Sequence, residues 1–263
     1  MFAFFSSAAI ADTTDYYGDK TLRYEDRVYV KNIQSVQLSP DPAVMAPAII
    51  RLGSAGTEDQ LILSFDDLDG DVKTYAYTLI HCSAKWEPSN ILVSEYLDGF
   101  ADNPVQDYRL SRNPIQRYTH YTLAFPNQQV KLLRSGNYLL KVYAGNNSDD
   151  VVITRRFLVY EEKVDLQVRV HAATIVADRN FKQEVDFTIR YSTGEITNPF
   201  AEITPVILQN GRWDNAVSGL KPQFLKDQEL IYDYEDVNVF RGGNEFRWFD
   251  TRSLRLQTER VGE

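Results

Sequence analysis

Apolar and polar residues alternate along most of the chain, in runs of five to eleven residues rich in aliphatic, β-branched and aromatic side chains. Turn-forming groups such as Asp69-Gly70 and Gly145-Asn146-Asn147 separate most of these runs. No stretch keeps the 3.6-residue apolar period of an amphipathic helix, so the pattern predicts an all-β fold. The expected strands of the first half are 28–38, 48–52, 61–65, 72–82, 118–125, 138–144 and 151–160.

Residues 135–143, SGNYLLKVY, place Tyr138, Leu140 and Val142 on one strand face. A Gly-x-Tyr sequence before a penultimate strand is typical of immunoglobulin-like sandwiches, where the tyrosine hydroxyl bonds back across a corner. We therefore expect a first domain over 24–160. A second set of runs predicts another domain over 161–263, with truncation at its C-terminus left open. The sequence thus predicts two consecutive immunoglobulin-like β-sandwich domains. The second set of expected strands is 164–170, 185–191, 201–208, 230–234, 245–249 and 254–258.

Between these strands, residues 85–117 look like one long irregular insertion that carries Trp86, Tyr96, Phe100 and Tyr108. A structureless loop of this length in a compact domain is usually functional or packed on itself. It is the surface of the first domain that we most expect to bind a partner.

Four aspartates, Asp66, Asp67, Asp69 and Asp71, surround Gly70 in the stretch LSFDDLDGDVKTYAY. An EF-hand register with the glycine at position 6 would put a phenylalanine at position 1 and an alanine at position 12, so this calcium loop is excluded. Asp-Gly between two strand-like runs instead predicts a solvated hairpin tip. A weaker cation site of another kind remains the alternative.

Net charge and the N-terminal residues limit the classes of function that we expect. The net charge is −9, which argues against nucleic acid as a main partner. The stretch before Ala11 is apolar and ends in an Ala-x-Ala pattern, which indicates a signal-peptide remnant over 1–11 and an exported protein. No lipobox cysteine follows, so no direct lipid anchor is expected.

The sequence shows no catalytic constellation. The three histidines, His81, His120 and His171, have no partner at metal-ligand spacing, and the single cysteine, Cys82, has no second thiol. Nucleophile-elbow, phosphate-loop and dinucleotide motifs are absent from the sequence. We therefore predict a protein that is not an enzyme and that needs no cofactor, metal or obligate small-molecule ligand.

Several stretches together resemble the plug proteins of the type 9 (type IX) secretion system of Bacteroidota. The resemblance runs from about residue 24 to the end, and its most specific parts are the stretch SFDDLDGDVK…YTLIHC…W and GGNEFRWFD. The stretches that carry it are TLRYEDRVYVKNIQSVQL, LILSFDDLDGDVKTYAYTLIHC, WEPSNILVSEYLDGF, YTHYTLAFPN, SGNYLLKVY, TRRFLVYE and RGGNEFRWFDTRSL.

The resemblance implies a periplasmic, non-enzymatic subunit, exported and held at the outer membrane through its partner. Such plugs bind the periplasmic opening of a very large outer-membrane β-barrel translocon and close it, and they usually extend past the point where this chain ends. The alternative is a carbohydrate-binding β-sandwich module, which Trp86, Trp213 and Trp248 suggest because exposed aromatic rings stack on sugars. The candidate partner-binding residues are Asp66, Asp67, Asp69, Asp71, Trp86, Tyr96, Phe100 and Trp248.

Overall fold

The structure is a computed structural model and describes residues 17, 19–43, 46–53, 60–192 and 196–243. The expected signal remnant over 1–11, Trp248 and the two expected strands after residue 244 lie outside these residues. Within them, no helix is both long enough and apolar enough to cross a membrane.

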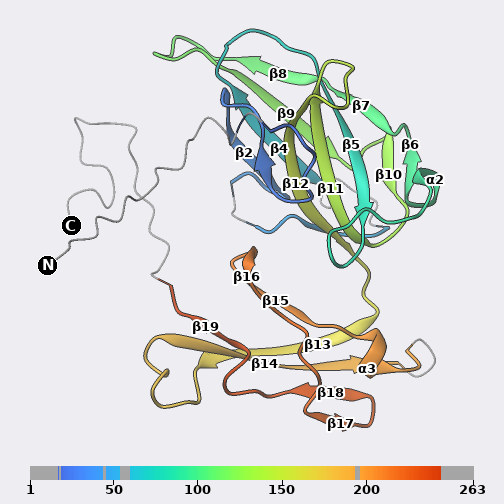
Figure 1. Cartoon of the computed structure of the whole chain (residues 1–263), viewed down its shortest axis with the longest axis vertical. Helices are drawn as coiled ribbons and strands as arrows, with labels where there is room; N and C mark the ends of the chain where they lie inside the picture. Colours follow the sequence, from blue (N-terminus) through green and yellow to red (C-terminus); the bar gives the residue numbers. More distant parts are fainter. Residues whose placement is uncertain (1–16, 18, 44–45, 54–59, 193–195, 244–263) are drawn as a thin grey trace, which may run out of the picture. The chain divides into compact units, whose positions relative to one another are not determined.

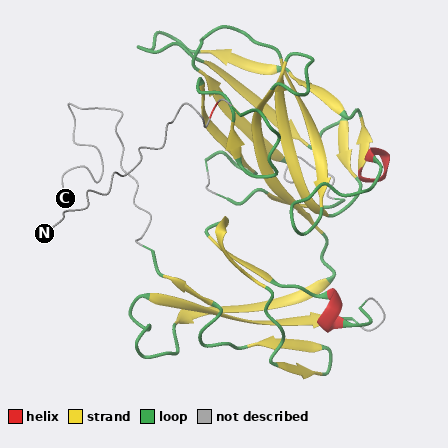
Figure 2. Ribbon diagram, in the orientation of Figure 1, coloured by secondary structure: helices red, strands yellow, loops and turns green. Residues whose placement is uncertain are grey.

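The chain divides into two compact units, of which the first ends at Glu161 and the second begins at Glu162. Strands make up nearly all of the regular structure in each unit, and the two described helices, α2 and α3, are four residues long (Figure 2). The prediction of an all-β fold is therefore confirmed.

The larger sheet of the first unit has six strands in the order β1-β12-β11-β5-β7, with β3 pairing in parallel with β12 (Figure 1). Its centre is the antiparallel pair β11 and β12, joined by a turn at Gly145. The strands are β1 (Arg27–Val28), β3 (Ile49–Arg51), β5 (Tyr75–Cys82), β7 (Asp102–Val105), β11 (Gly136–Ala144) and β12 (Val151–Tyr160).

A four-stranded sheet in the order β2-β4-β9-β8 faces the larger sheet, and the apolar side chains of both form one core. Along β9 every second side chain is buried, as the alternation predicts, and Phe125 of this strand packs edge-on against Phe157 of β12 at 5.2 Å between ring centres. A short pair, β6 and β10, forms a separate two-stranded sheet. The remaining elements of the first unit are β2 (Ile33–Ser39), β4 (Leu61–Asp67), β8 (Asp107–Leu110), β9 (Thr119–Phe125), β6 (Leu97–Gly99), β10 (Val130–Leu132) and α2 (Val93–Tyr96).

The tyrosine expected at the sandwich corner behaves as predicted. Tyr138 is fully buried at the start of β11, and its hydroxyl donates a 2.8 Å hydrogen bond to the carbonyl of Arg134, four residues upstream. This bond ties the turn before β11 to the core, which is the role that the Gly-x-Tyr pattern indicates.

Two predictions about connections are wrong. The turn at Asp69-Gly70 does not close a hairpin, because β4 pairs with β2 and β9 whereas β5 pairs with β11 and β7, in the other sheet. The segment 85–117 is not irregular either. It contains α2, β6, β7 and β8, of which β7 extends the larger sheet and β8 extends the smaller one.

The second unit contains a five-stranded sheet in the order β13-β14-β18-β17, with β19 also pairing with β14, and a hairpin of β15 and β16. Phe187 and Tyr232 stack at 4.4 Å between ring centres in its small core. The strand expected over 201–208 begins only at Val206, because Pro199 starts the helical turn α3. The elements are β13 (Val164–Ala172), β14 (Lys182–Tyr191), α3 (Pro199–Glu202), β15 (Val206–Gln209), β16 (Arg212–Ser218), β17 (Phe224–Lys226), β18 (Glu229–Tyr232) and β19 (Val239–Arg241).

Candidate functional site

The acidic turn, residues 67–73, is built around one buried carboxylate. Asp67 ends β4, and its side chain is inaccessible to solvent. Its oxygens accept hydrogen bonds from the Asn32 amide at 2.6 Å, the Tyr75 hydroxyl at 2.8 Å and the backbone N–H of Asp69 at 3.1 Å. A buried charge is tolerated only when it is paired and hydrogen-bonded in this way. The expectation of a fully solvated tip is therefore wrong for Asp67.

Lys73 supplies the positive charge of the acidic turn. Its ammonium lies 3.0 Å from Asp67 and 3.8 Å from Asp71, and it also forms an ion pair with Asp69. Burial alone would raise the pKa of Asp67, but the hydrogen bonds from the Asp69 amide, Lys73 and Tyr75 outweigh burial and lower that pKa below its ordinary value. The ammonium thus neutralises part of the negative charge of the acidic turn.

The acidic turn supports a neighbouring segment, residues 107–118, which we call the arm. The Gln116 amide donates to the Leu68 carbonyl at 2.9 Å, and directly after the arm, the hydroxyl of Thr119 in β9 donates to the Asp71 carbonyl at 2.6 Å. Gly70 has a φ of +69°, and a Cβ at this position would lie 2.7 Å from the Cβ of Arg117. The turn therefore needs glycine both for its backbone conformation and for close contact with the arm.

The arm consists of β8 and the loop that joins it to β9, and this loop projects beyond the sandwich (Figure 1). Backbone N–H of Ser111 donates to the carbonyl of Tyr118 at 3.0 Å and closes its base. Leu110 is 56% exposed and Ile115 is fully exposed. The arm also has three arginines against one aspartate, a net charge of +2 in a chain of net charge −9.

The strand β8 forms one edge of the four-stranded sheet and pairs with β9 only, within the part of the chain that the structure describes. A shallow groove follows the arm and is lined by Tyr108, Leu110, Arg112 and the pair Asp66–His120. In that pair, Nδ1 of His120 lies 2.7 Å from a carboxylate oxygen of Asp66. The arm thus combines an open strand edge with apolar and cationic side chains, a combination suited to binding another polypeptide.

The aromatic candidates of segment 85–117 divide into buried and exposed residues. Trp86 is buried, with the guanidinium of Arg156 at 4.5 Å from its ring centre. Tyr96 is also buried and donates a hydrogen bond to the Leu79 carbonyl at 3.3 Å. Phe100 is 73% exposed, so it alone of these three offers its ring to a partner. The burial of Trp86 removes one of the aromatic platforms on which the carbohydrate-binding alternative depends.

The His81–Ser89 pair and the Cys82 thiol are the two groups that we considered as possible nucleophilic sites. His81 Nδ1 lies 2.8 Å from the Ser89 hydroxyl, but its other ring nitrogen faces the Ser135 carbonyl at 3.3 Å rather than an orienting carboxylate. Cys82 is buried, and burial raises the pKa of its thiol to about 11, so the thiolate is scarce at neutral pH. Neither arrangement indicates covalent catalysis.

Comparison with known proteins identifies the first unit. No curated protein matches the chain. Among solved structures, the chain is similar to a hypothetical protein from Parabacteroides merdae, with a TM-score of 0.78 and 30% sequence identity. The similarity covers 86% of this chain and 56% of that one, so the chain spans little more than half the length of the solved relative. Residues 33–161, which include the acidic turn and the arm, match the sequence profile described as "Type 9 secretion system plug protein 1st domain". The resemblance found in the sequence is therefore confirmed over residues 33–161, which match the first domain of the plug proteins of the type 9 secretion system.

Proposed function

We propose that this chain is a non-enzymatic periplasmic subunit of the type 9 secretion system, which binds the periplasmic opening of the outer-membrane translocon barrel and closes it. The match of residues 33–161 to the plug family carries this proposal, since it associates the chain with this secretion system. The family is not an enzyme family, in agreement with the surroundings of His81 and Cys82.

We infer that the arm is the part of the first unit that contacts the translocon. Its open β8 edge can add to a strand of the partner through backbone hydrogen bonds, while Leu110 and Ile115 enter apolar pockets. Its net charge of +2 favours an acidic partner surface. The acidic turn has an indirect role in this proposal, because the ion pair between the buried Asp67 and Lys73 holds the turn on which the arm rests.

A stable complex generally buries roughly 1,000 Å² or more, and a single hairpin loop provides only part of that area. We therefore expect the arm to act as the energetic centre of a wider interface. Phe100, which is 73% exposed, is a second candidate contact within segment 85–117. A few side chains in well-packed, desolvated pockets commonly carry most of the binding energy, whereas the surrounding contacts add little.

Affinity purification of a tagged full-length protein from its native envelope, after mild detergent extraction, tests the proposal. The wild type is expected to retain one barrel protein of very high mass in near-equal amount. Changing Leu110 and Ile115 together to serine should reduce this retention at least tenfold, which corresponds to about 1.4 kcal/mol. The matched control changes Val176 and Phe224, exposed apolar residues of the second unit, to serine and should leave retention unchanged.

Each outcome bears on a different part of the proposal. If the wild type retains no barrel, closure of a translocon by this chain is rejected. If the wild type retains the barrel and both double variants do so equally well, the arm is not the docking element. Retention on polysaccharide resin without a barrel would favour the carbohydrate-binding alternative.

A further inference from the structure

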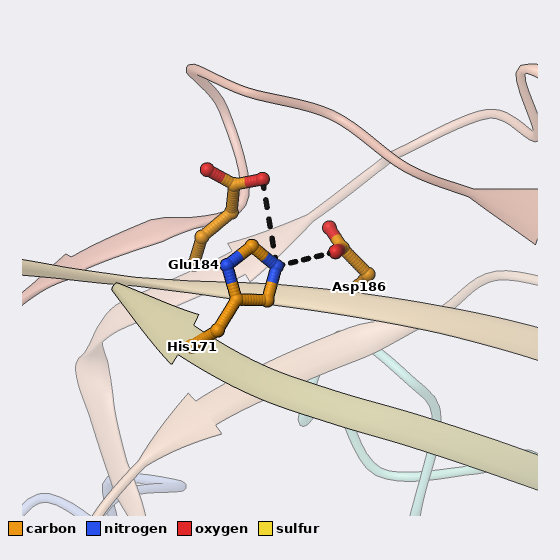
Figure 3. A group of neighbouring side chains, drawn as sticks. All are labelled: His171, Glu184 and Asp186. Carbon is orange, nitrogen blue, oxygen red and sulfur yellow. Dashed lines mark hydrogen bonds and ion pairs between the residues drawn. The ribbon is translucent and has the colours of Figure 1, made fainter. Parts of the chain in front are cut away.

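Three side chains with metal-binding chemistry converge on the second unit, outside the region of the proposed docking site. In the hairpin of β13 and β14, His171 is the cross-strand partner of Glu184, and Asp186 lies two residues further along β14. Alternate residues of a strand project from the same face, so the two carboxylates flank the imidazole (Figure 3). Within the described part of the chain, this is the one such group of three.

The distances between the three side chains suit a common ligand. Nε2 of His171 lies 2.5 Å from Oδ2 of Asp186 and 3.8 Å from Oε1 of Glu184, and one ligand atom of each residue lies within 4.8 Å of those of the other two. Ligands held at about 2.0–2.2 Å from a tetrahedral zinc ion stand roughly 3.3–3.6 Å apart. Rotations of the side chains that move the ligand atoms by about 1 Å would therefore bring all three to this spacing.

Neighbouring groups already orient His171 and Glu184. Nδ1 of His171 lies 2.8 Å from the Ala172 carbonyl, so the ring donates its Nδ1–H there and directs Nε2 at the carboxylates. A backbone carbonyl bonded to the second ring nitrogen is the usual outer partner of a metal-bound histidine. Glu184, only 1% exposed, accepts hydrogen bonds from the Thr174 N–H at 2.7 Å and from the Thr174 hydroxyl at 3.1 Å.

The charge of this cluster also calls for a cation. Two carboxylates face one imidazole, and one of the carboxylates is almost wholly inaccessible to water, which makes an uncompensated charge costly. The two acids together carry two negative charges. A divalent ion would neutralise both.

We propose that His171, Glu184 and Asp186 form a binding site for a divalent transition metal, with Zn²⁺ as the ion that fits best. One imidazole nitrogen beside two carboxylate oxygens favours zinc over calcium or magnesium, which prefer ligand sets made only of oxygen. His171 and Asp186 are partly exposed, so water can complete the coordination. The ion would join the edge strand β13 firmly to β14 and stabilise the second unit.

The full chain, treated with chelator and dialysed, is titrated with ZnCl₂ by calorimetry, and bound zinc is measured by atomic absorption. The wild type is expected to bind one zinc ion per chain and to gain thermal stability. The variants His171→Gln and Asp186→Asn should each bind at least tenfold more weakly. The control is His120→Gln, which removes a histidine that also faces a carboxylate on a neighbouring strand but is not part of a group of three.

The result that would overturn the proposal is a wild type that retains no zinc, or two variants that bind as tightly as the wild type. Loss of zinc in His120→Gln alone would also reject it. Circular dichroism of each variant verifies the fold. X-ray absorption of the zinc-loaded wild type provides a second measurement and should detect a single imidazole ligand, with oxygen or nitrogen atoms and no sulfur completing the coordination.

Discussion

Replacing Asp67 with asparagine removes the charge at the centre of the acidic turn while keeping the size of the side chain. Asp67 is fully buried and receives hydrogen bonds from Asn32, Tyr75 and the Asp69 amide, together with the Lys73 ammonium at 3.0 Å. An asparagine would replace one acceptor oxygen by an NH₂ donor. The Asn32 amide and the Lys73 ammonium are also donors, so one of their hydrogen bonds would be lost. Breaking a buried ion pair from one side typically costs about 3–5 kcal/mol. Because the Lys73 side chain is 32% exposed and keeps some hydration, we expect a loss of about 2–3 kcal/mol.

Urea unfolding followed by hydrogen-exchange mass spectrometry measures this loss, because the peptides of β4 and β5 report on the first unit separately from the second. The control is Asp71→Asn, since Asp71 is 64% exposed and lies 3.8 Å from Lys73, so its removal should cost less than about 0.5 kcal/mol. If Asp67→Asn were no less stable than this control, the buried pair would not hold the turn.

The effect of Asp67→Asn should also depend on pH. The pKa of Asp67 is lowered in the folded state, so the native state favours the ionised form. The stability that this provides is fully present above the unfolded pKa of about 3.9 and is lost as the pH falls through the lower folded pKa. The difference in unfolding free energy between wild type and variant should therefore be constant near neutral pH and shrink below about pH 4. An equal difference at all pH values would show that the charge is not its cause.

Two further predictions concern the same unit. Gly70→Ala should lower the unfolding free energy by about 2–4 kcal/mol, because it combines a φ of +69° with a Cβ 2.7 Å from that of Arg117. The control Gly145→Ala has a φ of +60° and open space around its Cβ, so it should cost only about 1 kcal/mol. Urea unfolding compares the two variants, and equal losses would exclude the contact with Arg117 as a cause. Burial raises the pKa of Cys82 to about 11, so alkylation by iodoacetamide at pH 8 should be slow in the folded protein and fast in urea, and labelling at the rate of a free thiol without urea would contradict this.

Features that depend on nearby residues could be predicted from the sequence. Along β9 the burial of every second residue follows from a period of two in the sequence itself. The bond from Tyr138 to Arg134 spans four residues, and the turn at Asn210-Gly211, where both residues have positive φ, joins β15 to β16 as that dipeptide indicates. In each case the structural cause lies within a few positions of the residue concerned.

Features that depend on strand partners could not be predicted in the same way. Asp69-Gly70 is as suitable for a connection between two sheets as for a hairpin, and the choice is made by β9 and β11, which are distant in the sequence. The burial of Asp67 depends likewise on Asn32 and Tyr75, which reach it from other segments. An acidic stretch that looks like a solvated tip thus contains a buried charge because its partners arrive from elsewhere in the fold.

The second unit shows what the alternation of residues along a strand can and cannot predict. On β13, the alternating residues Val164, Leu166, Val168 and Val170 have the pattern of a buried face, yet each is 41–58% exposed. Alternation specifies which side chains share a face, but it does not specify whether another layer covers that face.

The same reasoning applies to His171, Glu184 and Asp186. The spacing of the two acids places them on one face of a strand, whereas their closeness to the histidine depends on the register of the hairpin. The spacing of histidines and cysteines along the sequence therefore does not reveal this cluster. The register of the hairpin does reveal it, because Ala172 lies opposite Gln183 and His171 therefore lies opposite Glu184.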